Sequence, residues 1–281
     1  LHIGAPKTAT STLQHVLANN YRRLLKHGFL YPRDILESDA HHALACDLIE
    51  AHRGVPMDEV WYGAVPRGEA WGLLRDEIER HGNDCHSVIV SSELFFSQSR
   101  NLDAMLWDVI DHLTGHDIRV IVYLRRQDQL FSSFYNQDVK GIRQWRFSAY
   151  QFYLTHEIFQ QSYPEILTAW SEVLGRERLI IRPFESSRWP RGEIARDLCE
   201  TLGLPSLRGG TVERNDSLGI VQTYIKLCLN KIGFDKSLNE EVVRIVREIG
   251  PEKSIKDCVY IDRALYQKYR QGWIEDNRIL S

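Results

Sequence analysis

The sequence predicts an α/β fold in which a mainly parallel central sheet carries helices on both faces, as a three-layer sandwich. Three observations lead to this prediction. Short β-branched, apolar segments alternate with segments of helical periodicity along the 281 residues. A loop of small and hydroxylated residues separates the first apolar segment from the first helical segment. A later apolar segment, at residues 118–124, runs directly into two arginines.

The first strand is expected at residues 1–3, which lead into a loop at residues 4–12, GAPKTATST. A helix should follow, because apolar residues recur at helical spacing from Leu13 to Leu25. Gln14, His15 and Arg22 fall on the opposite, polar face of this pattern.

The rest of the chain continues the alternation. Strands are expected at residues 29–31, 86–92, 118–125 and 178–182. Helices are expected at residues 101–115, 190–202, 216–231, 238–249 and 260–271, and directly after Arg125. Since ligands of parallel sheets bind beyond the carboxyl ends of the strands, the segments after strands 1–3 and 118–125 should open onto one edge. We find no repeat or Gly/Ser/Pro-rich linker, and we expect one domain over residues 1–281.

The loop at residues 4–12 has the chemistry of an anion site. Its small side chains let successive backbone N–H groups approach phosphate oxygens, Lys7 adds a positive charge, and the following helix presents its positive end. The nucleoside-triphosphate loop G-x-x-x-x-G-K-[ST] is different, because here the lysine comes third after Gly4 and no second glycine is present.

Residues 6–11, PKTATS, resemble the 5′-phosphosulfate loop of the sulfotransferase family, P-K-[TS]-[GA]-[TS]-[ST]. Many members have glycine where this chain has alanine. The resemblance implies that the loop binds the phosphosulfate of 3′-phosphoadenosine-5′-phosphosulfate (PAPS) and that Lys7 stabilises the departing phosphate oxygen. The residues implied in this binding are Lys7, Thr8, Ala9, Thr10, Ser11 and Thr12.

A second segment supports the same family. Sulfotransferases share an arginine at the end of a strand and, eight residues later, a serine followed by an aromatic pair. Arg125 and Ser133 have this spacing, with Phe134 and Tyr135 after them. The resemblance implies that Arg125 and Ser133 bind the 3′-phosphate, a role that suits a guanidinium and a hydroxyl.

The resemblance implies a sulfotransferase with a P-loop NTPase-like fold, which moves a sulfuryl group from PAPS to a hydroxyl, with a saccharide or glycolipid as the expected acceptor. No metal is required. RPFE at residues 182–185 and the helix around residues 196–204 are similar to bacterial carbohydrate sulfotransferase-like proteins, which implies a bacterial, cytoplasmic protein.

The general base has three candidates. His41 and His42 lie between the loop and the next main strand, where the family often places its catalytic His or Glu, and we prefer His42. A histidine can take up a proton near neutral pH. Glu93, at the carboxyl end of strand 86–92, is the third candidate.

Two other functions stay open. A small-molecule kinase would use a nucleoside triphosphate and a magnesium-holding carboxylate. A catalytically silent module on the same fold would bind the nucleotide and transfer nothing. Arg214, Asn215 and Ser217 are weaker nucleotide-binding candidates, and the basic, aromatic stretch at residues 140–147 and residues 182–191 are candidate acceptor contacts.

Composition excludes several classes of protein. With 35 basic and 38 acidic side chains, no broad nucleic-acid surface is indicated. No apolar run is long enough to span a bilayer, and the five cysteines lie too far apart in the sequence to indicate a zinc site or a disulfide framework. The chain begins inside its expected first strand without a methionine, so we expect a trimmed start, and a preceding membrane anchor stays open. The sequence predicts no oligomeric state.

Overall fold

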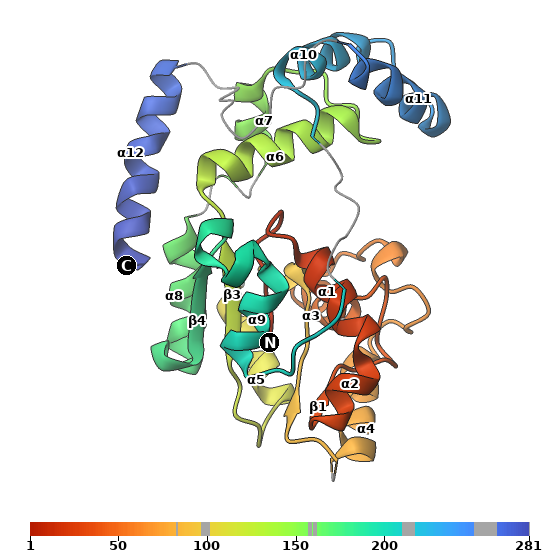
Figure 1. The fold of residues 1–281 in the computed structure, drawn as a ribbon, viewed down its shortest axis with the longest axis vertical. Helices are drawn as coiled ribbons and strands as arrows, with labels where there is room; N and C mark the ends of the chain where they lie inside the picture. The colour runs from red at the N-terminus through yellow and green to blue at the C-terminus, as the bar shows by residue number, and fades with distance from the viewer. Residues whose placement is uncertain are drawn as a thin grey trace. The chain divides into compact units, whose positions relative to one another are not determined.

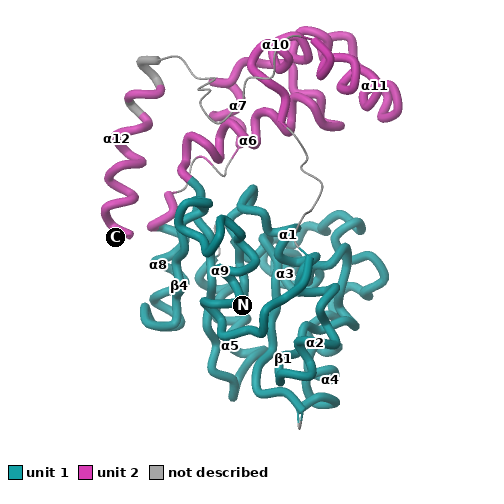
Figure 2. The backbone as a smooth tube through the Cα atoms, viewed as in Figure 1, with its two compact units in different colours: residues 1–125, 165–212 teal, residues 126–164, 213–281 magenta. Residues whose placement is uncertain are grey.

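The computed structural model describes residues 1–82, 84–96, 102–156, 159, 162–209, 217–249 and 263–280. The chain divides into two compact units, drawn in different colours in Figure 2. The first comprises residues 1–125 and 165–212, and the second comprises residues 126–164 and 213–281. We expected one domain, because the usual linker compositions are absent. The passages between the units at residues 125–126 and 164–165 have no Gly/Ser/Pro-rich linker, whereas residues 205–210, PSLRGG, come shortly before the passage at residues 212–213.

The first unit is built on parallel strands. Strand β1 (Phe29–Leu30) pairs with β2 (Ser87–Val88), and β3 (Val120–Leu124) pairs with β4 (Leu179–Pro183). His2 forms parallel bridges to Ser91 on one side and to Ile121 on the other. The backbone N–H of His2 donates to Val90 O at 2.7 Å, and that of Ile3 donates to Ile121 O at 3.1 Å. The N-terminal segment therefore lies between the two strand pairs.

Both faces of the central strands are buried. On β3, Ile121 and Tyr123 pack in one apolar cluster with Leu13 and Leu17 of helix α1 (Thr10–Asn19) and with Leu198 of helix α9 (Ile194–Leu202). Successive side chains of a strand point to opposite faces, so Val120 and Val122 face the other side, where both are fully buried. This two-sided burial explains the continuous apolar run that predicted the strand.

The first helical segment is divided in two. Helix α1 ends at Asn19 and α2 spans Tyr21–Lys26, whereas the periodicity predicted one helix. Asn20 lies at the break, where its Nδ2 donates to Val16 O at 2.7 Å and to Arg208 O at 2.8 Å. Its Oδ1 accepts from the backbone N–H of Arg208 at 3.0 Å. A tertiary contact therefore places the break, and local sequence periodicity does not reveal it.

Further helices of the first unit are α3 (His42–Arg53), α4 (Ala70–His81) and α5 (Leu102–His112), and α8 (Tyr163–Leu174) crosses the boundary between the units. Helices α3, α4 and α8 were not predicted. The Trp71 ring stacks on His112 with centroids 4.5 Å apart, and its Nε1 donates to Leu44 O at 3.0 Å, which joins α4, α5 and α3. Short 3₁₀ helices lie at Glu59–Trp61, Glu93–Phe95, Arg176–Arg178, Ser186–Arg188 and Pro190–Gly192.

The second unit is helical. It contains α6 (Gln127–Lys140), α7 (Ala149–Thr155), α10 (Ile220–Leu229), α11 (Lys236–Arg247) and α12 (Arg263–Leu280), labelled in Figure 1. Its core is an aromatic cluster in which Phe131, Tyr135 and Phe152 are buried. Asn136 ties α6 to the start of α10, since its Oδ1 accepts from Leu218 N at 3.0 Å. Across both units, no helix within the described ranges is long and apolar enough to cross a membrane.

Candidate functional site

The loop before α1 has an unusual backbone. Lys7 and Ala9 have positive φ angles of 65° and 58°, whereas Thr8 between them does not. Alternation in the sign of φ turns neighbouring N–H groups toward one side, the arrangement of anion-binding nests. The first N–H groups of α1, from Thr10 onward, have no intrahelical acceptor, and no side chain in the described part of the chain caps this helix. The loop therefore has the backbone geometry of an anion site.

Two inward contacts hold the loop. The Thr8 hydroxyl donates to Ala5 O, and Thr8 is fully buried. A Cβ atom at Gly4 would lie 2.3 Å from Thr10 Cγ2, so only glycine fits there without a shift. Thr8 and Gly4 are therefore structural residues of the loop, whereas Ser11 is exposed and Thr12 is partly exposed.

Arg125 joins the two predicted phosphate-binding motifs. It directly follows β3, and its Nη1 donates to Lys7 O at 3.1 Å, across 118 residues of sequence. The guanidinium lies 5.5 Å from the ring centroid of Phe184, which comes directly after β4. Ser133, the second residue of the 3′-phosphate motif, is partly exposed on α6 in the second unit.

His41 has a structural environment. It is fully buried, its Nε2 lies 2.9 Å from Pro32 O, and its Nδ1 accepts from the backbone N–H of Ser91 at 3.0 Å. Because the carbonyl needs a donor and the N–H needs an acceptor, the ring is neutral with its proton on Nε2. Burial lowers the pKa of His41 to about 4. Both nitrogens are therefore engaged by the main chain.

His42, at the start of α3, is placed differently. Its Nδ1 lies 2.9 Å from Ser92 Oγ, and its ring meets Trp61 edge to face with centroids 5.0 Å apart. With the proton on Nδ1, the ring donates to Ser92 and keeps a lone pair on Nε2. Burial lowers the pKa of His42, and the carboxylates of Glu93 and Glu37 oppose this shift. His42 is therefore poised to be neutral near pH 7.

Glu93 lies next to these groups and is linked to the loop helix. Its Oε2 accepts from Gln14 Nε2 at 3.1 Å, and Gln14 belongs to α1. Ser92 caps the 3₁₀ helix that begins at Glu93 by accepting from Leu94 N at 3.2 Å. The carboxyl end of the β2 segment therefore brings Glu93 and His42 together beside α1.

Sequence reasoning missed several members of this group. Gln14 was expected on the polar face of its helix, but it is only 2% exposed because it reaches Glu93. No pattern singled out Ser92, Trp61 or Glu37, whose roles depend on contacts between distant segments. Ser91 and Ser92, which directly precede Glu93, are the sequence feature that could have indicated a polar end to this strand.

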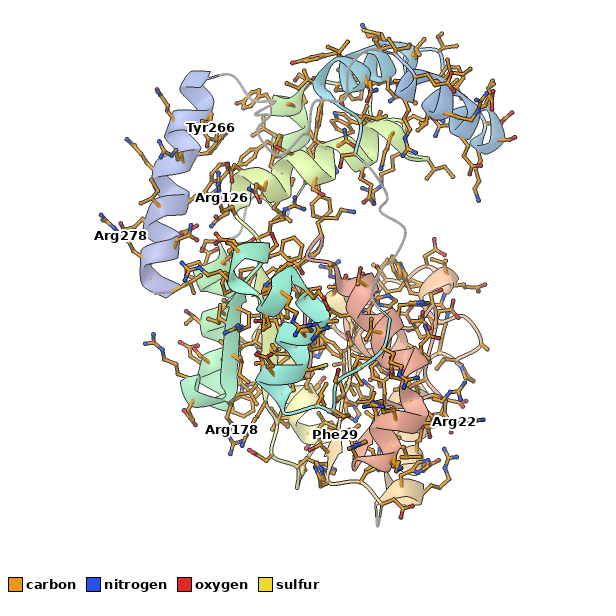
Figure 3. All side chains as sticks on the ribbon, in the orientation of Figure 1. Arg22, Phe29, Arg126, Arg178, Tyr266 and Arg278 are labelled. Carbon is orange, nitrogen blue, oxygen red and sulfur yellow. The ribbon has the colours of Figure 1, made fainter. Side chains whose placement is uncertain are left out.

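A cavity of about 560 Å³ lies elsewhere in the first unit. Its lining residues include Leu1, Phe29, Ser87 and Val120, so it lies toward the amino ends of the strands. Figure 3 labels Phe29 among these residues. None of the predicted site residues lines it. Arg214 and Asn215 fall outside the described residues, and Ser217 is exposed. The described residues contain no group of three His, Cys, Asp or Glu side chains able to hold a metal ion.

Comparisons with known proteins identify one distant relative. An uncharacterized protein of Archaeoglobus fulgidus is 28% identical over 152 residues, which cover 51% of this chain and 38% of the relative. The chain thus matches well under half of that protein's length. No family model matches the chain. No solved structure matches it either.

Proposed function

We propose that this protein is a sulfotransferase that moves a sulfuryl group from PAPS to a hydroxyl of an acceptor, with a saccharide or glycolipid as the expected acceptor class. The sheet order would then belong to a three-layer, P-loop-like sulfotransferase fold. The hydrogen bond from Arg125 to Lys7 O carries the proposal, because it brings together two motifs that the sequence connects only through this family.

The orientation of Thr8 favours this function over a kinase. In nucleoside-triphosphate loops, the hydroxyl residue directly after the lysine holds Mg²⁺. Here Thr8 occupies that position, but its hydroxyl donates to Ala5 O and the residue is fully buried. The hydroxyl directly after Lys7 is therefore engaged inside the loop and does not face a magnesium–nucleotide complex.

In the proposed reaction, the acceptor oxygen attacks sulfur in line with the bridging oxygen of PAPS. The new O–S bond forms as the bridging S–O bond breaks, and adenosine 3′,5′-bisphosphate leaves with the bonding electrons. Lys7 would stabilise the negative charge that develops on the departing phosphate. The acceptor proton passes to a base.

His42 is our preferred base among the three candidates. Both nitrogens of His41 are occupied by main-chain groups, so it has no lone pair to offer. His42 can keep a lone pair on Nε2 while Ser92 and Trp61 fix its ring. Glu93 remains the competing base, because its carboxylate lies in the same group and holds only one hydrogen bond from Gln14 among the described residues.

Transfer of radiolabelled sulfuryl from PAPS to a panel of saccharides, glycolipids and phenols tests the proposal. We expect the parent to label at least one hydroxyl acceptor, and Lys7→Ala to transfer about 10²- to 10³-fold more slowly, as for loss of other groups that stabilise developing charge. Lys26→Ala, an exposed lysine on α2, is the matched control and should not change the rate. A Lys7→Ala rate within a few fold of the parent would refute the role of Lys7.

The same samples separate the alternatives. A kinase would consume ATP with magnesium and ignore PAPS. A silent module would bind adenosine 3′,5′-bisphosphate and label no acceptor.

A further inference from the structure

Two loops of the second unit are joined into one surface. Gln144, in the loop between α6 and α7, bonds the main chain of Phe234, in the loop between α10 and α11. Its Oε1 accepts from Phe234 N at 2.9 Å, and its Nε2 donates to Phe234 O at 2.5 Å. Asn230 Nδ2 donates to Trp145 O at 2.8 Å. We call residues 140–147 and 231–236 the loop pair; both loops belong to the unit drawn in magenta in Figure 2.

The loop pair exposes large apolar side chains. Ile232 is 72% exposed and Ile142 is 70% exposed, which makes them the most exposed large apolar residues in the described part of the chain. Phe147 adds a ring that is 46% exposed. A single exposed apolar residue is ordinary, but here the two isoleucines lie two residues before Gln144 and Phe234, which tie the loops together. We call Ile142, Ile232 and Phe147 the apolar tip.

The same loops are strongly basic. Their only carboxylate is Asp235, which caps α11 by accepting from Leu238 N at 2.8 Å. The whole chain has a net charge of −3, so this positive charge is local. The basic residues of the loop pair are Lys140, Arg143, Arg146, Lys231 and Lys236.

The contacts of Arg143 and Arg146 leave these side chains exposed. Arg143 pairs with buried Asp138 at 3.0 Å, yet its side chain is 68% exposed. The guanidinium of Arg146 lies 5.4 Å from the centroid of the Phe147 ring. Four of the five basic residues, Arg143, Arg146, Lys231 and Lys236, are exposed on the same two loops as the exposed isoleucines.

We infer that the loop pair binds the surface of an anionic lipid bilayer, with Ile142 and Ile232 entering the headgroup region and the basic side chains facing lipid phosphates and carboxylates. Aliphatic side chains flanked by Lys and Arg suit this boundary, where apolar groups leave water and cations meet negative charge. A second copy of this chain is a poorer partner, because a symmetric contact would oppose the same basic residues. Nucleic acid is also a poorer partner, because its phosphates would pair with the basic side chains while the exposed isoleucines would bury no apolar surface.

Co-sedimentation of the full chain with vesicles tests the inference without donor or acceptor, so its result is independent of the proposed function. The vesicles contain phosphatidylcholine, with or without phosphatidylserine. We expect binding to the phosphatidylserine vesicles that weakens with salt. The double variant Ile142→Ser, Ile232→Ser should bind about tenfold or more weakly, as expected for removing two inserted side chains.

The double isoleucine variant and a second variant that removes two charges each have a matched control. Ile279→Ser replaces an isoleucine on α12 that is 60% exposed, and it should bind as the parent does. Arg146→Gln with Lys231→Gln should weaken binding roughly 25-fold, from about five-fold for each cation at the membrane surface. Arg22→Gln with Lys26→Gln removes the same charge from the first unit and should change binding little.

Several results would overturn the inference. Equal binding to both kinds of vesicle would contradict the anionic partner, and an unchanged double variant would contradict the loop pair. A parent that ignores vesicles but forms a dimer that the double variant breaks would make the surface a contact between copies. Preference for duplex DNA over vesicles would assign it to nucleic acid.

Discussion

Ala9 illustrates how single residues set the geometry of the loop. Its φ of 58° lies in the left-handed region, where a side chain costs roughly 1 kcal/mol. The glycine that many sulfotransferases have at the matching position is the residue that this backbone favours.

We predict opposite effects for two substitutions at this position. Ala9→Gly should raise the free energy of unfolding by about 0.5 kcal/mol, because relief of strain exceeds the entropy that glycine adds to the unfolded chain. Ala9→Val should lower it by roughly 1 to 3 kcal/mol, since a β-branched residue resists this conformation. Urea unfolding measures both, and a valine variant as stable as the parent would contradict the loop geometry.

His42 leads to a prediction about pH. Burial lowers its pKa, so the neutral form that accepts a proton persists below the ordinary histidine pKa of about 6.5. In single-turnover assays of the proposed reaction, sulfuryl transfer should stay level as the pH falls through about 6.5, and it should decline only at lower pH; we call this decline the acid limb of the profile. His42→Ala should reduce the rate of transfer by about 100-fold or more. The rate that remains should no longer decline at low pH, because the group whose protonation causes the decline is gone.

The same pH profile, measured for Glu93→Gln and His15→Ala, distinguishes the competing base and provides a control. If Glu93→Gln removes the acid limb and His42→Ala does not, Glu93 is the base. His15, which is exposed on α1 and lies 2.8 Å from Asp39 Oδ2, is the control histidine and should leave the profile unchanged.

Residue types predicted the candidate site only in part. The sequence singled out Lys7, Arg125, His42 and Glu93 as candidates because each belongs to a local pattern or ends a strand, and their roles stay predictions. Gln14 escaped, because its burial results from a contact to a residue 79 positions away. Local patterns report chemistry that neighbours in the sequence share, and they do not report contacts that the fold creates.

At the scale of elements, the predicted strands were observed to different extents: the strand expected at residues 86–92 comprises only Ser87–Val88, and residues 1–3 form isolated bridges at His2. Val120–Leu124 and Leu179–Pro183 were expected nearly at their observed bounds. Strand β3 is buried on both faces and has the continuous apolar run of such strands, whereas β4 is only partly buried and its last residue, Pro183, is exposed. Helix boundaries were less accurate: α9 begins at Ile194, since residues 190–192 form a 3₁₀ turn, and α12 continues to Leu280. Tertiary contacts and turn geometry set these ends.

His41 ties two elements and makes the fold sensitive to acid. Its folded-state pKa of about 4 lies below the unfolded value of about 6.5, so the unfolded chain binds the extra proton first as pH falls. The stability from neutral His41 is therefore fully present above about pH 6.5 and is lost progressively toward about pH 4.

The corresponding prediction concerns unfolding free energies at two pH values. Between about pH 7 and about pH 5, His41 should account for a loss of about 2 kcal/mol in the parent. His41→Gln should be less stable at neutral pH and should lack this part of the decline. His15→Gln should keep it. An identical pH slope in parent and His41→Gln would contradict the buried, neutral ring.

At the scale of the molecule, each unit has its own apolar core. Phe152 is fully buried in the aromatic cluster of the second unit, and Leu17 is fully buried in the cluster that covers β3 in the first. We predict that Phe152→Ala and Leu17→Ala each remove about 3 to 4 kcal/mol from the unit that contains the substituted residue.

Hydrogen exchange with mass spectrometry separates the two effects. Phe152→Ala should lower protection mainly in residues 127–156 and 220–249, and Leu17→Ala mainly in residues 10–19 and 120–124. Uniform loss of protection along the chain in either variant would show that the two units unfold as one.

Calorimetric titration with adenosine 3′,5′-bisphosphate tests the central claim most directly. We predict binding that exceeds the affinity for ATP with magnesium and that weakens about tenfold or more in Arg125→Gln, as for loss of hydrogen bonds to a charged group. Arg126→Gln, an exposed neighbour that pairs with Asp128, should bind as the parent does. A folded parent without measurable affinity for this nucleotide would contradict the claim.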